Sequence, residues 1–163
     1  MGLFDFLKSD NNKEAELYNP VEGEVIQLEE VSDPVFSQKM MGDGFGVEPA
    51  NGEIYSPIDG KVVSVFPTSH ALGLELDNGI EVLVHIGVDT VELEGGPFDI
   101  HVSEGDKVTK DSHLATVDLA ALEEAEKPDT VMVVFTNMDV VENYDLKSTG
   151  NMSQGDTVGS VSS

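Results

Sequence analysis

The sequence contains no cysteine and no arginine, and its basic side chains are eight lysines. Without cysteine, disulfide bonds, thiolate metal ligands and thiol catalysis are all excluded. Without arginine, any site that handles phosphate has to replace a guanidinium clamp with histidine, hydroxyl groups and backbone N–H groups. The chemistry open to this chain is therefore narrow.

Long apolar runs are also absent. No stretch approaches the roughly 20 apolar residues that a helix needs to span a bilayer. Residues 1–5 (MGLFD) have neither the basic region nor the cleavage site of a signal peptide. We therefore expect a cytoplasmic protein. The chain starts at its own methionine and ends without a hydrophobic extension, so we also expect it to be free-standing, and we expect a monomer.

Because basic side chains are few, the protein carries an extreme negative charge. Eight basic residues stand against 32 acidic ones, which gives a formal net charge of −24 at pH 7. Nucleic acid and anionic membranes are poor partners for such a surface, because neutralising phosphates requires clustered cations. A basic protein partner is favoured instead, through salt-sensitive electrostatic steering.

The remaining pattern predicts an all-β fold. With 163 residues the chain forms one domain of ordinary size, and short apolar segments alternate with Gly, Asn-Gly and Asp-Gly turn signals. This spacing is typical of an antiparallel β-sandwich or barrel with short helical segments. One helix is expected over residues 119–126, with Asp118 as N-cap and Pro128 beyond its end. The expected strands lie at residues 24–28, 45–47, 53–55, 61–66, 107–108, 131–136 and 157–161.

The N-terminal residues read as a separate segment. A short amphipathic piece containing Leu3, Phe4, Phe6 and Leu7 precedes a polar run. It could touch a membrane surface weakly or remain a frayed tail. We therefore expect a flexible segment over residues 1–18 and the folded domain over residues 19–163.

A hairpin is expected over residues 70–87. Asn-Gly between two apolar runs is the strongest short-range hairpin signal, because a type I′ turn needs positive φ at both central residues. If Asn78 and Gly79 form a two-residue loop, Asp77 pairs with Ile80.

The hairpin brings two histidines together at its open end. In the expected register Leu72 lies opposite His85 and His70 lies opposite Gly87. The two histidines are then diagonal neighbours on one face, roughly 7–8 Å apart. A slip of one residue would place them on opposite faces. Two converging imidazoles indicate metal binding, proton transfer or phosphate chemistry.

The strings around these histidines resemble a known family. TSH at 68–70 and VHIGVDTVEL at 84–93 closely resemble the glucose-family IIA proteins of the bacterial phosphoenolpyruvate-dependent sugar phosphotransferase system. The resemblance extends from MGLFD at 1–5, through VSDPVF at 31–36, to NMD at 137–139. It implies a phosphocarrier domain with a β-sandwich fold that requires no cofactor.

The resemblance also implies roles for particular residues. His85 would accept a phosphoryl group from the phosphohistidine of the carrier protein HPr and pass it to a cysteine on the IIB domain of a sugar permease. Its Nε2 would attack, with Nδ1–H donated to the carbonyl of Gly87. His70, oriented by the Thr68 hydroxyl, would hold the phosphoryl group without carrying it. The backbone at Gly87 and in residues 88–91, including Asp89 and Val91, would complete the anion site.

Partner-binding positions are implied as well. The resemblance assigns docking roles to two sets of residues, although the apolar ones fit a core role and the acidic ones fit solvated charge. The apolar set is Val35, Phe36, Met40, Met41 and Phe66, and the acidic set is Asp33, Asp89, Glu92 and Asp139.

Other interpretations remain open from the residues alone. His70 and His85, with Asp89 or a ligand from a partner, could bind zinc. The chain could regulate other proteins according to its phosphorylation state. It could also be a lipoyl-type carrier, although no modifiable lysine has the expected neighbours. His101 and His113 are interpreted as ordinary surface or hydrogen-bonded histidines.

Overall fold

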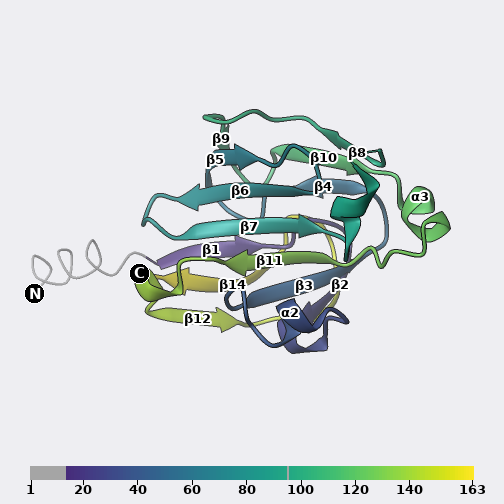
Figure 1. The fold of residues 1–163 in the computed structure, drawn as a ribbon. Coiled ribbons are helices and arrows are strands. Elements are labelled where there is room, and N and C mark those ends of the chain that lie inside the picture. Colours follow the sequence, from purple (N-terminus) through teal and green to yellow (C-terminus); the bar gives the residue numbers. More distant parts are fainter. Residues whose placement is uncertain (1–13, 95) are drawn as a thin grey trace, which may run out of the picture.

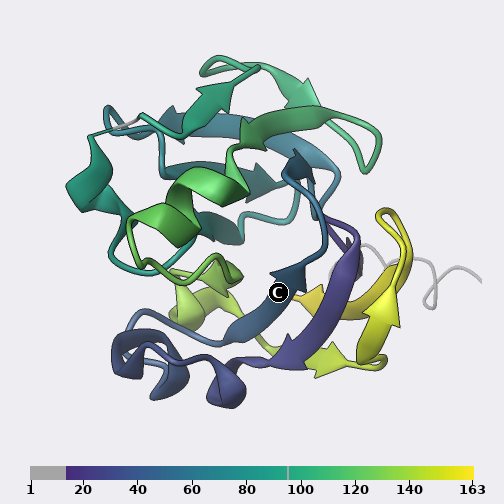
Figure 2. The ribbon, with the colours of Figure 1, turned by 90° about the vertical axis from the view of Figure 1, so that its right-hand side faces the viewer.

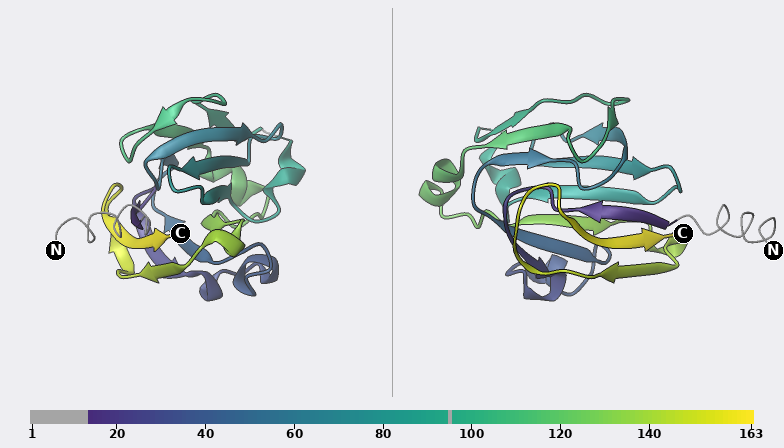
Figure 3. Two further views of the ribbon diagram at one scale, coloured as in Figure 1. Left: turned by 90° about the vertical axis from the view of Figure 1, so that its left-hand side faces the viewer. Right: turned by 180° about the vertical axis from the view of Figure 1, so that it is seen from behind.

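The computed structural model describes residues 14–94 and 96–163 (Figure 1). An eight-stranded sheet runs in the order β13-β2-β3-β11-β7-β6-β5-β9, and every strand pairing in it is antiparallel. Two three-stranded sheets, β1-β14-β12 and β4-β10-β8, complete the fold. Seen from behind, β1 and β14 lie over the large sheet (Figure 3). The expected all-β fold is therefore confirmed.

The elements are short and follow one another through tight turns. The strands are β1 (Glu14–Tyr18), β2 (Gly23–Gln27), β3 (Gly44–Pro49), β4 (Glu53–Tyr55), β5 (Gly60–Val65), β6 (Ala71–Leu76), β7 (Glu81–Ile86), β8 (Phe98–Ile100), β9 (Lys107–Val108), β10 (His113–Val117), β11 (Val131–Phe135), β12 (Asn143–Leu146), β13 (Gly150–Met152) and β14 (Thr157–Ser162). The helical segments are η1 (Leu28–Glu30), α2 (Pro34–Ser37), η2 (Thr90–Leu93), α3 (Leu119–Glu124) and η3 (Met138–Val140).

Strand β11 lies at the centre of the packing. It pairs with β3 on one side and β7 on the other, and all five of its residues are buried. Val131, Val133 and Phe135 enter the main core, while Met132 and Val134 enter a smaller cluster on the opposite face. Because side chains alternate along a strand, burial of all five means that both faces of β11 are covered.

The expected helix is present and begins where the sequence indicated. The Asp118 carboxylate accepts a hydrogen bond from Ala121 N–H at 3.1 Å, which satisfies one of the free N–H groups of the first turn. The helix ends at Glu124, two residues earlier than expected. No helix in residues 14–94 and 96–163 is long and apolar enough to cross a membrane.

The expected domain boundary at residue 18 is wrong. Residues 14–18 form β1, which pairs antiparallel with β14, and Leu17 is fully buried. The exposed acidic residues of this strand, Glu14 and Glu16, alternate with the half-buried Ala15 and the buried Leu17. The amphipathic piece within residues 3–7 lies outside the described residues.

The register of the central hairpin also differs from the expected one. Gly79 N–H donates to the Leu76 carbonyl and Leu76 N–H donates to the Ile80 carbonyl, each at 2.9 Å. The loop therefore has three residues, 77–79, with Gly79 at φ +93°. A type I turn followed by a residue in the left-handed region is the second common hairpin connection. His85 consequently pairs with Ala71, one residue away from the expected partner.

Candidate functional site

His85 lies one residue before the end of β7, on the face of the strand that points away from the main core. Its neighbours Val84 and Ile86 are fully buried in that core, whereas His85 is partly exposed. It pairs with Ala71 on β6 and with Met132 on β11. The sheet therefore holds the backbone of His85 on both sides, and only the ring faces outward.

The orientation of the His85 ring is fixed by one hydrogen bond. Nδ1 lies 2.8 Å from the carbonyl oxygen of Gly87. A carbonyl can only accept, so Nδ1 carries the hydrogen and Nε2 carries the lone pair. This is the bond expected from the resemblance, and it presents Nε2 as the nucleophilic atom of the ring.

The loop after β7 turns the Gly87 carbonyl back toward His85. Gly87 has φ +79°, and its N–H donates to the Thr130 carbonyl at 2.8 Å. Val88 N–H donates to the Pro128 carbonyl at 3.0 Å, and the Thr90 hydroxyl donates to the Ile86 carbonyl at 2.5 Å. The segment after α3 thus supplies the scaffold of this loop.

His70 reaches the same place from just before β6. It follows Ser69, which has φ +59°, and its carbonyl accepts the N–H of Ile86 at 2.8 Å. His70 precedes the regular β6–β7 ladder, so the alternation of side chains along β6 does not decide on which face the His70 side chain lies. Both histidines therefore lie at one site although the register differs by one residue from the expected one. The side chain of His70 is buried.

The Thr68 hydroxyl orients the His70 ring. Thr68 Oγ1 lies 2.5 Å from His70 Nδ1. When the hydroxyl donates to Nδ1, the neutral ring carries its hydrogen on Nε2. His70 then offers a hydrogen-bond donor at Nε2, whereas His85 offers a lone pair at Nε2.

The two rings meet edge to face and are bordered by aromatic side chains. The centroids of His70 and His85 are 4.9 Å apart, with an interplanar angle of 77°. Phe36 lies 4.9 Å from His85, and Phe66 lies 5.7 Å from His70. These contacts remove water from the flanks of the rings and leave their nitrogen atoms as the polar centre of an apolar rim.

Burial keeps both rings neutral. Loss of solvation, and after it the proximity of His70, lowers the pKa of His85 to about 4, although the Gly87 hydrogen bond, Asp33 and Asp89 act in the opposite direction. Burial likewise lowers the pKa of His70. The charged form of each ring loses solvation that the protein does not replace. His85 Nε2 is therefore unprotonated throughout the neutral range.

A titration checks this directly. An ordinary histidine with pKa about 6.5 would be only about one-tenth neutral at pH 5.5. We expect His85 to remain neutral there and to titrate near pH 4 in a pH series of ring NMR signals. The unfolded chain binds the proton first, so this group adds stability above about pH 6.5 that is lost as the pH falls through 4. A titration midpoint of His85 near pH 6.5 would contradict this prediction.

The expected backbone anion site is only partly free. The N–H groups of Gly87 and Val88 are already donated to carbonyls, so Gly87 acts on the site through its carbonyl and not through its N–H. The N–H groups of Asp89 and Thr90 donate to no backbone carbonyl of residues 14–94 and 96–163. Asp89 has φ +58°, which turns the chain at this point. The two free N–H groups are thus the candidates for anion binding.

Substitution of Gly87 tests how the loop orients His85. A Cβ at Gly87 would lie 2.4 Å from Thr90 Cγ2 and 2.9 Å from the Pro128 carbonyl oxygen, at φ +79°. Positive φ costs a non-glycine residue about 1–3 kcal/mol. We expect Gly87→Ala to lower Tm by about 4–10 °C. The same change weakens the hydrogen bond from His85 Nδ1 that favours the charged ring, so the His85 pKa should fall further below its ordinary value.

Gly105 is the matched control. It has φ +93°, and a Cβ there meets nothing within 4 Å. Gly105→Ala should lower Tm through backbone strain alone and leave the His85 titration unchanged. An unchanged His85 titration in Gly87→Ala would show that the loop does not set the ring.

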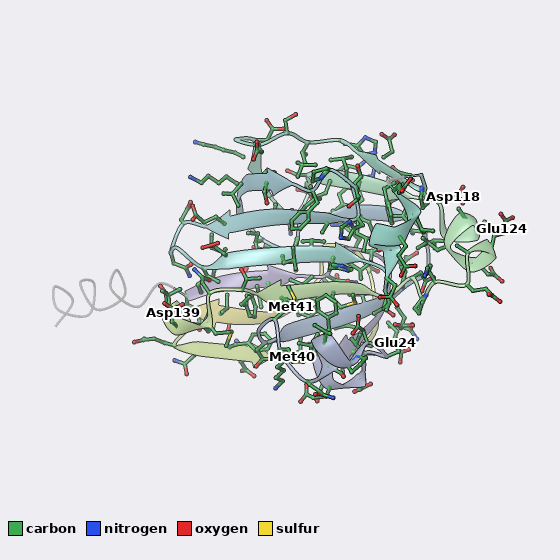
Figure 4. The ribbon with its side chains drawn as sticks, in the orientation of Figure 1. Glu24, Met40, Met41, Asp118, Glu124 and Asp139 are labelled. Atoms are coloured by element: carbon green, nitrogen blue, oxygen red, sulfur yellow. The ribbon has the colours of Figure 1, made fainter. Side chains whose placement is uncertain are left out.

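The apolar partner-binding candidates divide into one buried residue and an exposed set. Phe36 is 5% exposed and packs in the smaller cluster beside His85, so it serves the core of the site. Figure 4 shows Met40 and Met41 on the same side of the molecule as the large sheet. Met41 and Phe66 also line one shallow hollow over β5, β6 and β7. The exposed large apolar side chains are Val35, Met40, Met41, Val63, Phe66, Met138 and Val140, of which sequence reasoning missed Val63, Met138 and Val140.

The acidic candidates have different surroundings. The Asp33 carboxylate caps α2 by accepting from Val35 N–H at 2.8 Å. Glu92 forms an ion pair with Lys127 at 3.3 Å. Asp139 lies at the opposite end of the sheet from the end of β7, as Figures 1 and 4 show. Asp33 and Asp89 both act electrostatically on His85, whereas Asp139 does not adjoin the two histidines.

Sequence reasoning missed the contribution of the segment after α3. Pro128 and Thr130 act through their carbonyls, which carry no signature in the sequence. Figure 2 shows this segment beside the end of the large sheet. Across residues 14–94 and 96–163, no group of three His, Asp or Glu side chains could hold a metal ion. A zinc site at His70 and His85 would therefore need a ligand from outside the chain.

Comparison with known proteins gives the family. A family described as phosphoenolpyruvate-dependent sugar phosphotransferase system, EIIA 1, matches residues 15–141. A glucose-specific EIIA component of Staphylococcus epidermidis is 42% identical over 146 residues, which cover 90% of this chain and 88% of that protein. A glucose-specific EIICBA component of Streptococcus pneumoniae is 52% identical over 146 residues, and the chain spans 20% of its length.

A solved structure agrees with these sequence matches. The chain superposes on glucose permease IIA from Mycoplasma capricolum with a TM-score of 0.83 and 36% sequence identity. The match covers 91% of this chain and 96% of that structure. Fold and sequence therefore agree, and the chain belongs to the EIIA 1 family of the phosphoenolpyruvate-dependent sugar phosphotransferase system.

Proposed function

We propose that this protein is a phosphocarrier in sugar uptake, which accepts a phosphoryl group from phospho-HPr on Nε2 of His85 and passes it to the IIB domain of a sugar permease. The observation that carries the proposal is the hydrogen bond from His85 Nδ1 to the Gly87 carbonyl at 2.8 Å. It commits the hydrogen to Nδ1 and leaves Nε2 as the nucleophile. The relatives named as glucose-specific components make glucose the first sugar to test.

Two displacements make up the reaction. The lone pair of His85 Nε2 forms the new N–P bond while the N–P bond of the HPr phosphohistidine breaks and returns its electron pair to the HPr imidazole. A thiolate on the IIB domain then attacks phosphorus, and the electron pair of the second N–P bond returns to His85 Nε2. The protein supplies positioning and charge stabilisation for both displacements.

The oxygens of the phosphoryl group need donors that do not include arginine. His70 donates from Nε2–H, which the Thr68 hydroxyl orients through Nδ1 at 2.5 Å. Within the described part of the chain the N–H groups of Asp89 and Thr90 donate to no backbone carbonyl, and with that of Val91 they would supply backbone donors. These neutral donors take the place of a charged arginine clamp. They stabilise the phosphoryl group while it is bound to His85, and they still allow it to leave in the second displacement.

The surface around the site fits a partner with an apolar centre and basic residues at its rim. Val35, Met40, Met41 and Phe66 supply exposed apolar area, and Asp33 and Asp89 supply negative charge at the histidines. A net charge of −24 would steer a basic partner to this protein at low salt. The first encounter with the partner should therefore slow as ionic strength rises.

Phosphoryl transfer tests the proposal. The protein is incubated with labelled phosphoenolpyruvate, purified enzyme I and HPr, and then with a glucose-specific IIB domain. We expect an acid-labile, base-stable label on the protein that moves to IIB. Absence of label with HPr fully phosphorylated would overturn the proposal, and label that never reaches IIB would overturn its second half.

A further inference from the structure

The other two histidines of the chain also form a pair, on a different sheet. His101 follows β8 directly, and its N–H donates to the Leu114 carbonyl on β10 at 2.8 Å. His113 is the first residue of β10. The ring centroids of His101 and His113 are 4.5 Å apart, with an interplanar angle of 36°. Neither ring takes part in the site at His85.

A short hydrogen-bonded chain holds both rings. The register of β10 against β4 shifts between His113 and Ala115, and this irregularity lets Thr116 lie beside His113. His113 Nε2 and Thr116 Oγ1 each lie 2.9 Å from Glu53 Oε1, and His101 Nε2 lies 2.8 Å from Thr116 Oγ1. One carboxylate on β4 thus anchors both histidines.

The donors and acceptors of this chain fix the tautomers. The Glu53 carboxylate only accepts, so it takes hydrogens from His113 Nε2 and from the Thr116 hydroxyl. The single hydroxyl hydrogen of Thr116 is then committed, so Thr116 accepts from His101 Nε2–H. Each neutral ring is left with its lone pair on Nδ1. Two adjacent imidazoles therefore each present a nitrogen ligand with the other nitrogen held by an oxygen.

The surroundings favour a bound cation. Tyr55 stacks on His113 with centroids 4.9 Å apart and an angle of 24°, which restricts that ring. The Glu53 carboxylate accepts hydrogen bonds from both Thr116 and His113, which places a negative charge behind the His113 ring. Asp99 pairs with Thr116 across the ladder and adds a second carboxylate to the same face.

We propose that His101 and His113 bind one divalent transition-metal ion of the class that imidazole prefers, namely Zn²⁺, Ni²⁺ or Cu²⁺, through their two Nδ1 atoms. Two imidazoles bound to one ion at about 2.0–2.1 Å have ring centres roughly 4.5–5.2 Å apart, and the observed separation of 4.5 Å lies at the lower end of that range. Metal-bound histidines usually donate their other N–H to a carboxylate or another oxygen, as both do here.

The site has two protein ligands only. No group of three His, Asp or Glu side chains in the described parts of the chain could hold a metal ion, so water completes the coordination sphere. Glu53 and Thr116 act on the metal through the rings they hold. The ion therefore exchanges readily and is removed by a chelator.

A metal titration tests this site apart from the phosphoryl site. Zn²⁺ is titrated by calorimetry into the His70→Gln variant, in which the other histidine pair is broken, with millimolar Mg²⁺ present to occupy surface carboxylates. We expect one Zn²⁺ per chain, and in the NMR spectrum the ring Nδ1 signals of His101 and His113 should shift together. His101→Gln and His113→Gln should each abolish binding, and Glu53→Gln should weaken it roughly 10- to 100-fold.

Two results would overturn the proposal. One is no saturable Zn²⁺ binding in a folded His70→Gln protein. The other is binding that survives in a variant carrying both His101→Gln and His113→Gln, which would place the ion on the acidic surface. Circular dichroism checks that each variant folds, and each should still accept a phosphoryl group from phospho-HPr, because neither histidine touches the site at His85.

Discussion

His85→Ala is expected to abolish phosphoryl acceptance completely. The variant keeps the fold, because His85 lies on the outward face of β7 and is absent from both core clusters. It loses the only nitrogen that the Gly87 carbonyl holds ready with a free lone pair. Incubation with labelled phosphoenolpyruvate, enzyme I and HPr should leave this variant without label while HPr itself becomes labelled.

The matched control for His85→Ala is His113→Ala. It removes an equally sized ring from the surface of another sheet, and it should be labelled as fast and as fully as the wild type. Label of normal stability on His85→Ala would show that another side chain carries the phosphoryl group. His70 would then be the first residue to examine, because its ring is 4.9 Å from that of His85.

His70→Gln is expected to separate the two halves of the reaction. Nε2 of His85 remains, so the variant should still take label from phospho-HPr. It loses the donor that Thr68 orients toward the phosphoryl oxygens. Removal of one preorganised donor typically costs about 10²–10³-fold in rate. Single-turnover transfer from labelled protein to a IIB domain should fall by that factor.

Thr68→Val should produce a smaller loss of the same onward transfer rate. It keeps the His70 ring and removes only the hydroxyl that orients it, so the expected loss is smaller, roughly tenfold, the value of one ordinary hydrogen bond. Equal onward rates in wild type, Thr68→Val and His70→Gln would contradict a supporting role for His70. A loss of label uptake in His70→Gln would place this residue in the first displacement as well.

The sequence predicted the proximity of His70 and His85 correctly but assigned the wrong strand register to the hairpin that carries them. Asn78-Gly79 signals a hairpin, but the same dipeptide fits a two-residue loop and a three-residue loop that ends on Gly79. Only the ladder of β6 against β7 distinguishes them. The site survives the difference because His70 lies before β6, where Ser69 at φ +59° redirects the chain. The two histidines are thus close together as expected, but the two-residue loop from which their proximity was inferred is not the loop that the hairpin has.

Other features of the site depend on contacts between residues far apart in sequence. The carbonyls of Pro128 and Thr130 hold the loop after His85, and a carbonyl is present at every position of every chain. Likewise, His101 and His113 read as ordinary surface histidines when each is considered alone. Their pairing depends on β8 lying beside β10 and on the irregular register of β10 against β4. The local sequence pattern predicts neither the carbonyl contacts of Pro128 and Thr130 nor the pairing of His101 with His113.

The most direct test of the account is the identity of the phosphorylated atom. The protein is labelled with ¹⁵N at its histidine rings, phosphorylated through enzyme I and HPr, and compared by NMR with the unphosphorylated form. We expect the phosphorylation shift on Nε2 of His85, with Nδ1 of the same ring still protonated by virtue of its bond to the Gly87 carbonyl. A phosphorylation shift on Nδ1 of His85, or on any ring of His70, His101 or His113, would contradict it.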